Sequence, residues 1–139
     1  MQLPQEYNIK EAEEKWQKYW EKEKIYKFDE NSKKEIFSID TPPPTVSGKM
    51  HIGHAFSYSH TDFIARYKRM NNYNVFYPFG TDDNGLPTER LVEKTKNVKA
   101  KNLPRNEFIN LCMDFLKKEL PSFVQDWKNI GLSPDFSIY

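Results

Sequence analysis

The stretch Thr41–His54, which reads Thr-Pro-Pro-Pro-Thr-Val-Ser-Gly-Lys-Met-His-Ile-Gly-His, decides how the rest of the chain is interpreted. A β-rich run that contains Ile36 and Ile39 precedes it, and an unbroken series of helix formers follows it. This order predicts a strand-to-helix turn that carries a glycine and two histidines, His51 and His54. Turns of this kind hold phosphate groups in α/β proteins.

The composition favours one soluble domain. The chain has 139 residues, enough for one domain with a core. Its 21 Lys plus Arg nearly balance its 20 Asp plus Glu, so its net charge does not favour binding to nucleic acid or to a membrane. A local basic patch is still compatible with this composition. Cys112 is the single cysteine, which excludes an internal disulfide and suits a reducing compartment. No apolar run is long enough for a bilayer, and residues 1–6 lack a signal-peptide pattern. We therefore expect a cytoplasmic protein.

Hydrophobic patterning predicts a βαβ unit around the opening stretch. Residues 35–40 and 73–79 are rich in β-branched and aromatic types and predict strands, with a helix at 53–70 between them. A crossover of this length joins parallel strands. The segments 41–54 and 80–85 then follow the carboxyl ends of neighbouring strands, where open α/β sheets bind ligands.

Helices are predicted on both sides of this unit. Residues 8–24 read as an amphipathic helix that Asn8 caps, with Trp16 and Trp20 as its anchors. Proline lacks the N–H that a helix interior needs, so Pro121 is expected to break a helix. The predicted downstream elements are a short helix at 87–93, a lysine-rich connector at 94–101, a helix from 104 to Pro121, a second one ending at Gly131, and the start of a third strand at 134–139.

The residue types in the turn suit phosphate chemistry. His51 and His54 are three residues apart, hence on one side of the first helical turn, where both rings can donate to one phosphate. Free first-turn N–H groups and the helix dipole attract an anion, and Gly53 allows a flat nucleobase or ribose to approach the backbone. Such donors stabilise the transition state of phosphoryl or nucleotidyl transfer.

The His-x-Gly-His pattern alone has other interpretations: half of a metal site, or polar residues that merely begin a helix. Zinc is disfavoured because the chain has no cysteine cluster and His60 is its only other histidine. We interpret His60 as a surface or packing residue and Cys112 as a small core residue. The lysines of 94–101 are interpreted as a solvated loop, with an RNA contact as the alternative.

Longer strings carry a family resemblance. They are Ile-Asp-Thr-Pro-Pro-Pro-Thr-Val-Ser-Gly-x-x-His-Ile-Gly-His, Asp-Phe-Ile-Ala-Arg-Tyr-Lys-Arg-Met and Tyr-Asn-Val-Phe-Tyr-Pro-Phe-Gly-Thr-Asp-Asp-Asn-Gly-Leu-Pro-Thr-Glu. Over about residues 37–93 the chain resembles class I aminoacyl-tRNA synthetases, and within them the valyl-tRNA synthetases of the archaeal type. The isoleucine and leucine relatives share His-x-Gly-His, so the proline-rich prefix and the last string favour valine.

The resemblance implies a fold and a domain organisation. The fold is α/β: the N-terminal half of a Rossmann-like parallel sheet, of the HIGH type that class I synthetases share, with flanking helices. Residues 1–34 would be an N-terminal helical segment, and residues 35–139 the first half of the catalytic nucleotide-binding domain.

The resemblance also implies a reaction. Valine and ATP, accompanied by Mg²⁺, would give valyl-adenylate and pyrophosphate, and the valyl group would pass to tRNA(Val). His51 and His54 would be catalytic, binding the ATP phosphates and stabilising the pentavalent α-phosphorus. Thr45 would help to hold the phosphates, and Gly53 would lie under the adenine. No protein ligands for a metal are implied.

The amino-acid site follows from the same resemblance. Pro43 and Pro44 would form its wall, and Asp82 would accept the α-ammonium group of valine, a charge-assisted contact. An apolar wall rejects isoleucine by size but separates valine from isosteric threonine only weakly. The family therefore adds an editing domain.

A whole enzyme of this family is several times longer than 139 residues. The sequence contains neither a Lys-Met-Ser-Lys-Ser-type loop nor the second half of the nucleotide fold, the editing insertion or an anticodon-binding domain. We interpret the chain as the N-terminal part of such a synthetase, incomplete by itself. The alternatives are a subunit that pairs with a complementary C-terminal chain, and a non-catalytic binding module derived from a synthetase.

Overall fold

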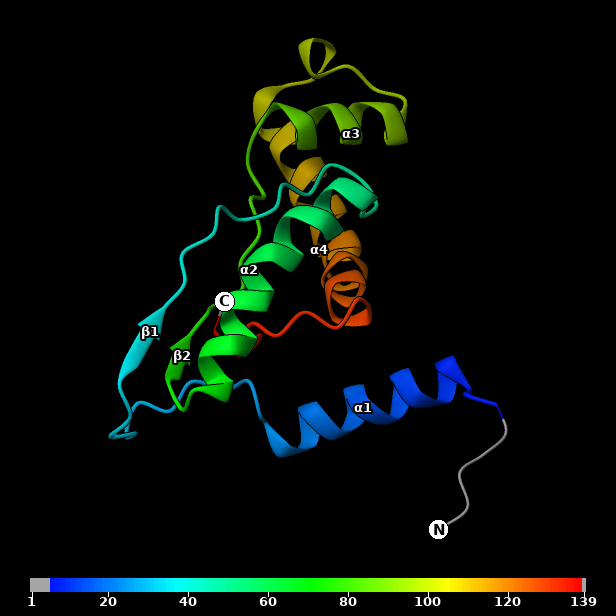
Figure 1. The fold of residues 1–139 in the computed structure, drawn as a ribbon. Coiled ribbons are helices and arrows are strands. Elements are labelled where there is room, and N and C mark those ends of the chain that lie inside the picture. Colours follow the sequence, from blue (N-terminus) through cyan, green and yellow to red (C-terminus); the bar gives the residue numbers. More distant parts are fainter. Residues whose placement is uncertain (1–5, 139) are drawn as a thin grey trace.

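Two short parallel strands and the helix that connects them form the centre of the fold (Figure 1). In the computed structural model, which describes residues 6–138, β1 (Ile36–Ser38), α2 (Ile52–Met70) and β2 (Asn74–Phe76) follow one another. Phe37 lies opposite Val75 in the parallel register. The predicted βαβ unit and the partial Rossmann-like α/β fold are confirmed, with strands shorter than the predicted ranges.

The sheet is built where β-formers meet one face of α2. Ile39, Val75 and Tyr77 are buried with Ala65 of α2, and Phe37 and Tyr73 pack against this cluster. The other edge of β1 has no strand beside it within residues 6–138. This edge of β1 is therefore free within the described residues, and a further strand could pair with it.

The longest helix, α4 (Arg105–Asn129), corrects the expected break at Pro121. Pro121 is exposed, and the chain stays helical through it. Leu116 before it and Phe123 and Trp127 after it are buried in the main core cluster with Val46, Phe79 and Leu132. Burial of an apolar side chain stabilises by about 1.5–3 kcal/mol, which offsets the loss of one helical hydrogen bond.

The remaining helices lie at opposite ends of the molecule (Figure 1). α3 (Leu86–Lys96) and the short 3₁₀ helix η1 (Ala100–Asn102) pack against the first half of α4. α3 is longer than the predicted 87–93, so only residues 97–99 of the lysine-rich connector remain between two helical segments. α1 (Ile9–Glu23) lies at the other end and buries none of its residues completely.

Two features of α1 bear on the prediction. The Asn8 cap is confirmed, since its side chain accepts the Glu11 N–H at 3.3 Å. Trp20 is partly buried and lies beside Tyr26, but Trp16 is 45% exposed and contacts only Tyr19 among the aromatic residues of the described chain. Trp20 is therefore the anchor of α1, and Trp16 is not.

The end of the chain runs beside β2 without forming a further strand within residues 6–138. Asp135 donates its N–H to the Tyr77 carbonyl at 2.7 Å, and Pro78 and Asp135 form a single parallel bridge. The last residue of the predicted strand, Tyr139, lies outside the described residues, as do residues 1–5 of the segment judged for a signal peptide. None of the helices within residues 6–138 has the length and apolar character needed to cross a membrane.

Candidate functional site

The two histidines of the opening stretch form a stacked pair at the start of α2. His51 is the N-cap residue, and its ring lies 4.0 Å from that of His54, centroid to centroid, at an interplanar angle of 24°. The Nδ1 atom of His51 accepts the Gly53 N–H at 3.1 Å, and that of His54 faces the His51 N–H at 3.5 Å. The pair is thus a reciprocal capping box made of imidazoles.

This pattern assigns the protons of both rings. A neutral imidazole accepts at one nitrogen and donates from the other, so the acceptor role of each Nδ1 leaves the proton on Nε2. Partial burial, and secondarily the charge of His51, lower the pKa of His54 below its ordinary value. Near neutral pH His54 is therefore a neutral ring with an Nε2–H donor beside that of His51.

The backbone of the turn is less free than predicted. The His51 carbonyl accepts the N–H groups of both His54 and Ala55, at 2.9 and 3.2 Å, and the Gly53 N–H is occupied by the His51 ring. Three N–H groups at the start of α2 are therefore already engaged within the turn. The position of Gly53 also favours glycine for a local reason, because a Cβ atom there would lie only 3.0 Å from His51 Cε1.

Thr45 and Asp82 lie side by side beyond the two strands. They form a parallel bridge in which Asp82 donates its N–H to the Pro44 carbonyl at 2.9 Å and its carbonyl accepts the Val46 N–H at 3.2 Å. The Thr45 hydroxyl donates to Asp82 Oδ2 at 3.3 Å, and the Asn84 N–H donates to Oδ1 at 3.2 Å. The sequence assigned these two residues to different ligands, and the structure brings them into direct contact.

A small cavity of about 210 Å³ opens at the carboxyl ends of the strands. Pro43 and Pro44 line it from the segment after β1, and Tyr77 and Phe79 from the segment after β2. Tyr58 of α2 closes one side and donates its hydroxyl to the Pro42 carbonyl at 2.5 Å. The lining is largely apolar, and Asp82 is not part of it.

Trp127 connects the histidine pair to this cavity. The indole has no exposed surface, and its ring centroid lies 5.8 Å from that of His54, 4.6 Å from that of Tyr58 and 6.0 Å from that of Phe79. Its Nε1–H has no hydrogen-bond partner within residues 6–138. Trp127 is therefore a packing residue that lies directly behind the candidate site.

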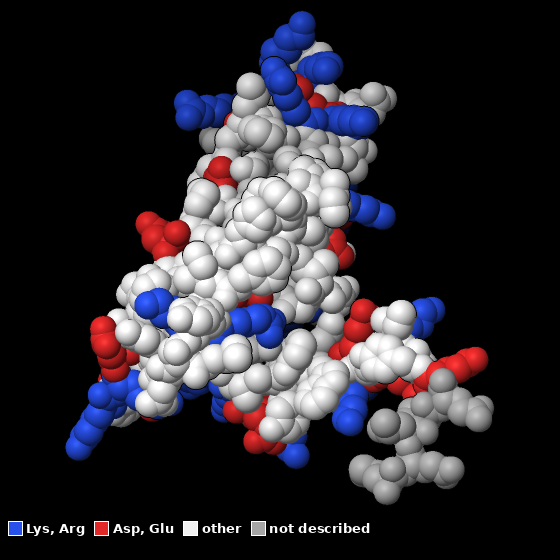
Figure 2. All heavy atoms as spheres, viewed as in Figure 1, with Lys and Arg blue, Asp and Glu red and all other residues white. Residues whose placement is uncertain are grey.

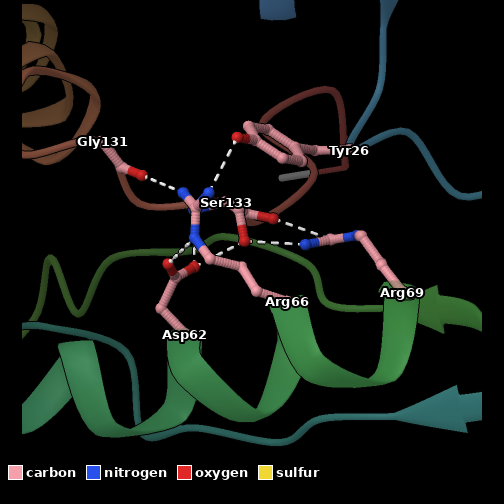
Figure 3. Close-up of polar contacts among 6 residues, drawn as sticks. All are labelled: Tyr26, Asp62, Arg66, Arg69, Gly131 and Ser133. Atoms are coloured by element: carbon pink, nitrogen blue, oxygen red, sulfur yellow. Dashed lines mark hydrogen bonds and ion pairs between the residues drawn. The ribbon is translucent and has the colours of Figure 1, made fainter. Parts of the chain in front are cut away.

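A polar cluster in the middle of α2, which we call the clamp, was missed by the sequence analysis (Figure 3). Asp62 is buried, and its Oδ1 accepts the N–H and the hydroxyl of Ser133 at 2.7 and 2.6 Å. Its Oδ2 accepts from Arg66 Nε at 2.6 Å, and Arg69 donates to the hydroxyl and carbonyl of Ser133, both at 2.7 Å. Arg66 also donates to the Gly131 carbonyl.

The clamp fastens three parts of the chain together. Arg66 reaches the Tyr26 hydroxyl at 3.2 Å, so the segment after α1 and the segment after α4 both meet α2 here (Figure 3). The signal in the sequence was available: Asp62, Arg66 and Arg69 recur at i, i+4 and i+7, which sets three charges on one face of a helix. Charges at such spacing normally indicate a solvated face, and here they point inward.

Other candidate residues stand apart from the site. His60 is exposed and its ring lies 4.4 Å from that of Phe56. Cys112 packs beside the cluster between α3 and α4, and burial raises the pKa of its thiol. No group of three or more His, Cys, Asp or Glu residues within 6–138 is arranged to hold a metal ion.

Known proteins resemble the chain in sequence and in fold. The family model described as tRNA synthetases class I (I, L, M and V) matches residues 15–138. Valine–tRNA ligase of Rickettsia prowazekii is 54% identical over 138 residues, covering 99% of this chain, and that of Thermoplasma acidophilum is 52% identical over 132 residues, covering 95%. The chain spans only 17% of the length of either relative.

A solved structure agrees on the fold. The ternary complex of Agrobacterium radiobacter K84 agnB2 LeuRS–tRNA–LeuAMS superposes with a TM-score of 0.76 over 95% of this chain and 15% of that one, at 24% sequence identity. The stacked histidines and the strand-end cavity lie within residues that the family model matches.

Proposed function

Because this chain belongs to the class I tRNA synthetase family, we propose that it is the N-terminal part of a valine–tRNA ligase and forms part of the site that activates valine with ATP. The reaction joins the valine carboxylate to the α-phosphate of ATP and releases pyrophosphate. Transfer of the valyl group to tRNA(Val) completes the activity of the whole enzyme. The cytoplasm is the compartment that suits this role.

The stacked pair of His51 and His54 is the observation that carries the proposal. The two stacked rings keep their Nδ1 atoms in the capping box, so their Nε2–H groups are the donors that can meet the oxygens of a triphosphate, on which charge grows in the transition state. In this proposal both residues are catalytic, and Mg²⁺ arrives with ATP as part of the substrate.

The other predicted residues are assigned to the same reaction. Thr45 lies against Asp82, so a ligand that takes up the Asp82 carboxylate would free the Thr45 hydroxyl for a phosphate oxygen. Asp82 is the proposed acceptor for the valine ammonium group, and Pro43 and Pro44 the apolar wall for its isopropyl group. Gly53 is the proposed place where the adenine approaches the backbone.

The isolated chain presents surfaces that a larger catalytic domain would cover. One side of α2 exposes large apolar residues, among them Ile52 (85%), Phe63 (65%) and Met70 (85%), and β1 has a free edge within the described residues. We propose that the remaining catalytic domain of a class I synthetase covers both, either in the same polypeptide or as a complementary chain. The length of the relatives supports this choice of occupant.

Valine-dependent exchange of pyrophosphate into ATP tests the proposal. We expect weak or no exchange by residues 1–139, and exchange after the chain is combined with the C-terminal remainder of a valine–tRNA ligase. Isoleucine exchanged in preference to valine would contradict the specificity. No exchange in the combined protein, with both parts folded, would favour the non-catalytic binding module.

His54→Ala in the combined protein separates catalysis from folding. Loss of one preorganised donor is expected to reduce exchange by about 10²–10³-fold, while loss of the stacked ring costs about 1 kcal/mol of unfolding free energy. His60→Ala is the matched control, because it removes an exposed ring from the same helix. Equal losses of activity and of stability in His54→Ala would indicate a merely structural histidine.

A further inference from the structure

Six cationic side chains gather at the end of the molecule opposite α1. Figure 2 shows Lys and Arg concentrated over α3 and η1, at the top of the view. All six are exposed. We call this surface the basic tip, and its residues are Arg90, Lys94, Lys96, Lys99, Lys101 and Arg105.

The charges of the basic tip are not neutralised by neighbours. No ion pair within residues 6–138 includes any of the six residues; the paired cations are Lys18, Lys22, Arg66 and Lys128. Residues 89–107 contain six cations and three glutamates, a net charge of +3, whereas the whole chain carries +1. The nearly neutral composition of the whole chain therefore conceals a local excess of positive charge at the basic tip.

One of the three glutamates is also turned toward the protein. The Glu93 carboxylate accepts the Ala100 N–H at 2.7 Å and so holds η1 against α3. This contact brings the residues after α3 back over its last turn. The fold thus packs cations from separate segments together instead of spreading them along an extended loop.

The helix dipole explains only part of this arrangement. Lys94 and Lys96 lie in the last turn of α3, where positive charge is favourable. Arg105 is the first residue of α4, where the dipole disfavours a cation. Glu107 supplies the acidic residue of that first turn, so the dipole is complemented there while Arg105 adds a further cation to the surface.

A hollow of about 480 Å³ lies within the basic tip. Lys94 and Lys99 line it together with Asn97 and Asn102, and Glu93, whose carboxylate accepts the Ala100 N–H, also forms part of its wall. The side-chain amides of the two asparagines make no hydrogen bond within residues 6–138. Lysine cations and asparagine amides are the groups that proteins offer to phosphate and sugar oxygens of a nucleic-acid backbone.

From these observations we propose that the basic tip binds the phosphate backbone of an RNA, in a hollow distinct from the histidine pair. The choice of RNA over another polyanion rests on the proposed function, since that reaction ends on tRNA. The contact carries no base recognition and instead positions the RNA against the protein.

Fluorescence anisotropy of a labelled tRNA(Val) transcript, titrated with the chain at several KCl concentrations, tests this proposal. The tip variant combines Lys94→Ala, Lys99→Ala, Lys101→Ala and Arg105→Ala. The control variant removes the same charge elsewhere, by Lys10→Ala, Lys33→Ala, Lys34→Ala and Lys117→Ala, all at exposed positions. Circular dichroism establishes that both variants remain folded.

We expect the tip variant to bind at least about tenfold more weakly. The slope of log K against log salt should become shallower by about 0.7–0.9 for each phosphate that no longer meets a cation. The control variant is expected to keep most of the affinity. Equal weakening in both variants, or no binding by the parent chain, overturns the proposal. Poly-glutamate binding as tightly as tRNA overturns the assignment to RNA.

A charge-preserving variant keeps the test valid if the alanine variant unfolds. Lys94→Arg with Lys99→Arg and Lys101→Arg retains the cations and is expected to bind within about threefold of the parent, because the phosphate contact depends on charge. The outcome is independent of pyrophosphate exchange, which needs no tRNA. Failure of this proposal and failure of the proposed function are therefore distinguishable.

Discussion

The two halves of α2 are built in opposite ways. Its first turn, with His51 and His54, is exposed or half-buried and is held by hydrogen bonds between residues at most four apart. Its middle, at Asp62 and Arg66, reaches residues 40 to 71 positions away through buried or partly buried contacts. One helix thus carries a locally organised first turn and a tertiary anchor.

Different contacts therefore set the position of the candidate site in the molecule and the arrangement of its two histidine rings. The clamp holds the segment after α4, and Trp127, four residues before Gly131, then packs behind His54 and Tyr58. The histidine rings are set against each other by their own capping box. Damage to the clamp should therefore unfold or displace the site as a whole, whereas damage to the turn should change its chemistry with little cost in stability.

The largest expected effect is in the clamp. Asp62→Ala leaves the Arg66 guanidinium and the N–H and hydroxyl of Ser133 without their buried acceptor, and we expect a loss of about 3–5 kcal/mol of unfolding free energy. Urea denaturation followed by circular dichroism measures it. Asp114→Ala, an exposed substitution on α4, is the control and should change stability by less than about 0.5 kcal/mol. Similar losses of unfolding free energy in Asp62→Ala and Asp114→Ala would show that the clamp does not anchor α2.

A smaller effect is expected within the turn. In Gly53→Ala the new methyl group meets His51 Cε1 at 3.0 Å, so the ring must move away from its capping position. The better helix propensity of alanine opposes the weakened cap, and we expect a net change in unfolding free energy within about 1 kcal/mol. Pyrophosphate exchange in the combined protein should fall by about tenfold or more, since small displacements of reacting groups are costly.

Gly80→Ala is the matched control for that substitution. Its Cβ would meet nothing within 4 Å, although Gly80 lines the strand-end cavity. Its exchange rate should stay close to that of the parent. A drop as large as that of Gly53→Ala would show that the cavity mouth, and not the imidazole cap, limits the reaction.

The smallest expected effect is a dependence of the unfolding free energy on pH that arises from His54. The pKa of His54 is lower in the folded chain than the ordinary histidine value of 6.5, so the unfolded state binds the proton more readily. Its contribution to stability is complete above pH 6.5 and is lost as the pH falls from there toward the folded pKa. His54→Gln should therefore lose less unfolding free energy than the parent between about pH 7.5 and pH 5.5.

Urea denaturation at the two pH values measures this difference, and NMR titration of the His54 ring measures the pKa directly. If Trp127→Phe returns that pKa toward the ordinary value, the packing of Trp127 against His54 is what lowers the pKa of the ring. An equal pH dependence in His54→Gln and the parent would assign the effect to other groups.

The sequence predicted the βαβ unit because its signals are local. Alternating β-formers mark 35–40 and 73–79, and three prolines end the first strand. The turn between strand and helix followed from the glycine and the histidines. Pro121 gave the wrong element boundary, because proline propensity contains no term for the burial of Leu116 and Phe123 on either side.

The family, the parallel strand order and the candidate residues of the turn could be predicted from the amino-acid sequence, because each is encoded in short-range patterns. The folded structure was needed to see that Asp62, Arg66 and Arg69 point inward, that Trp127 lies behind His54, and that dispersed lysines and arginines form one basic tip. Those facts depend on contacts between residues far apart in the chain. The burial and charge of a side chain are set by what packs against it, and the pattern of its own helix does not specify that partner.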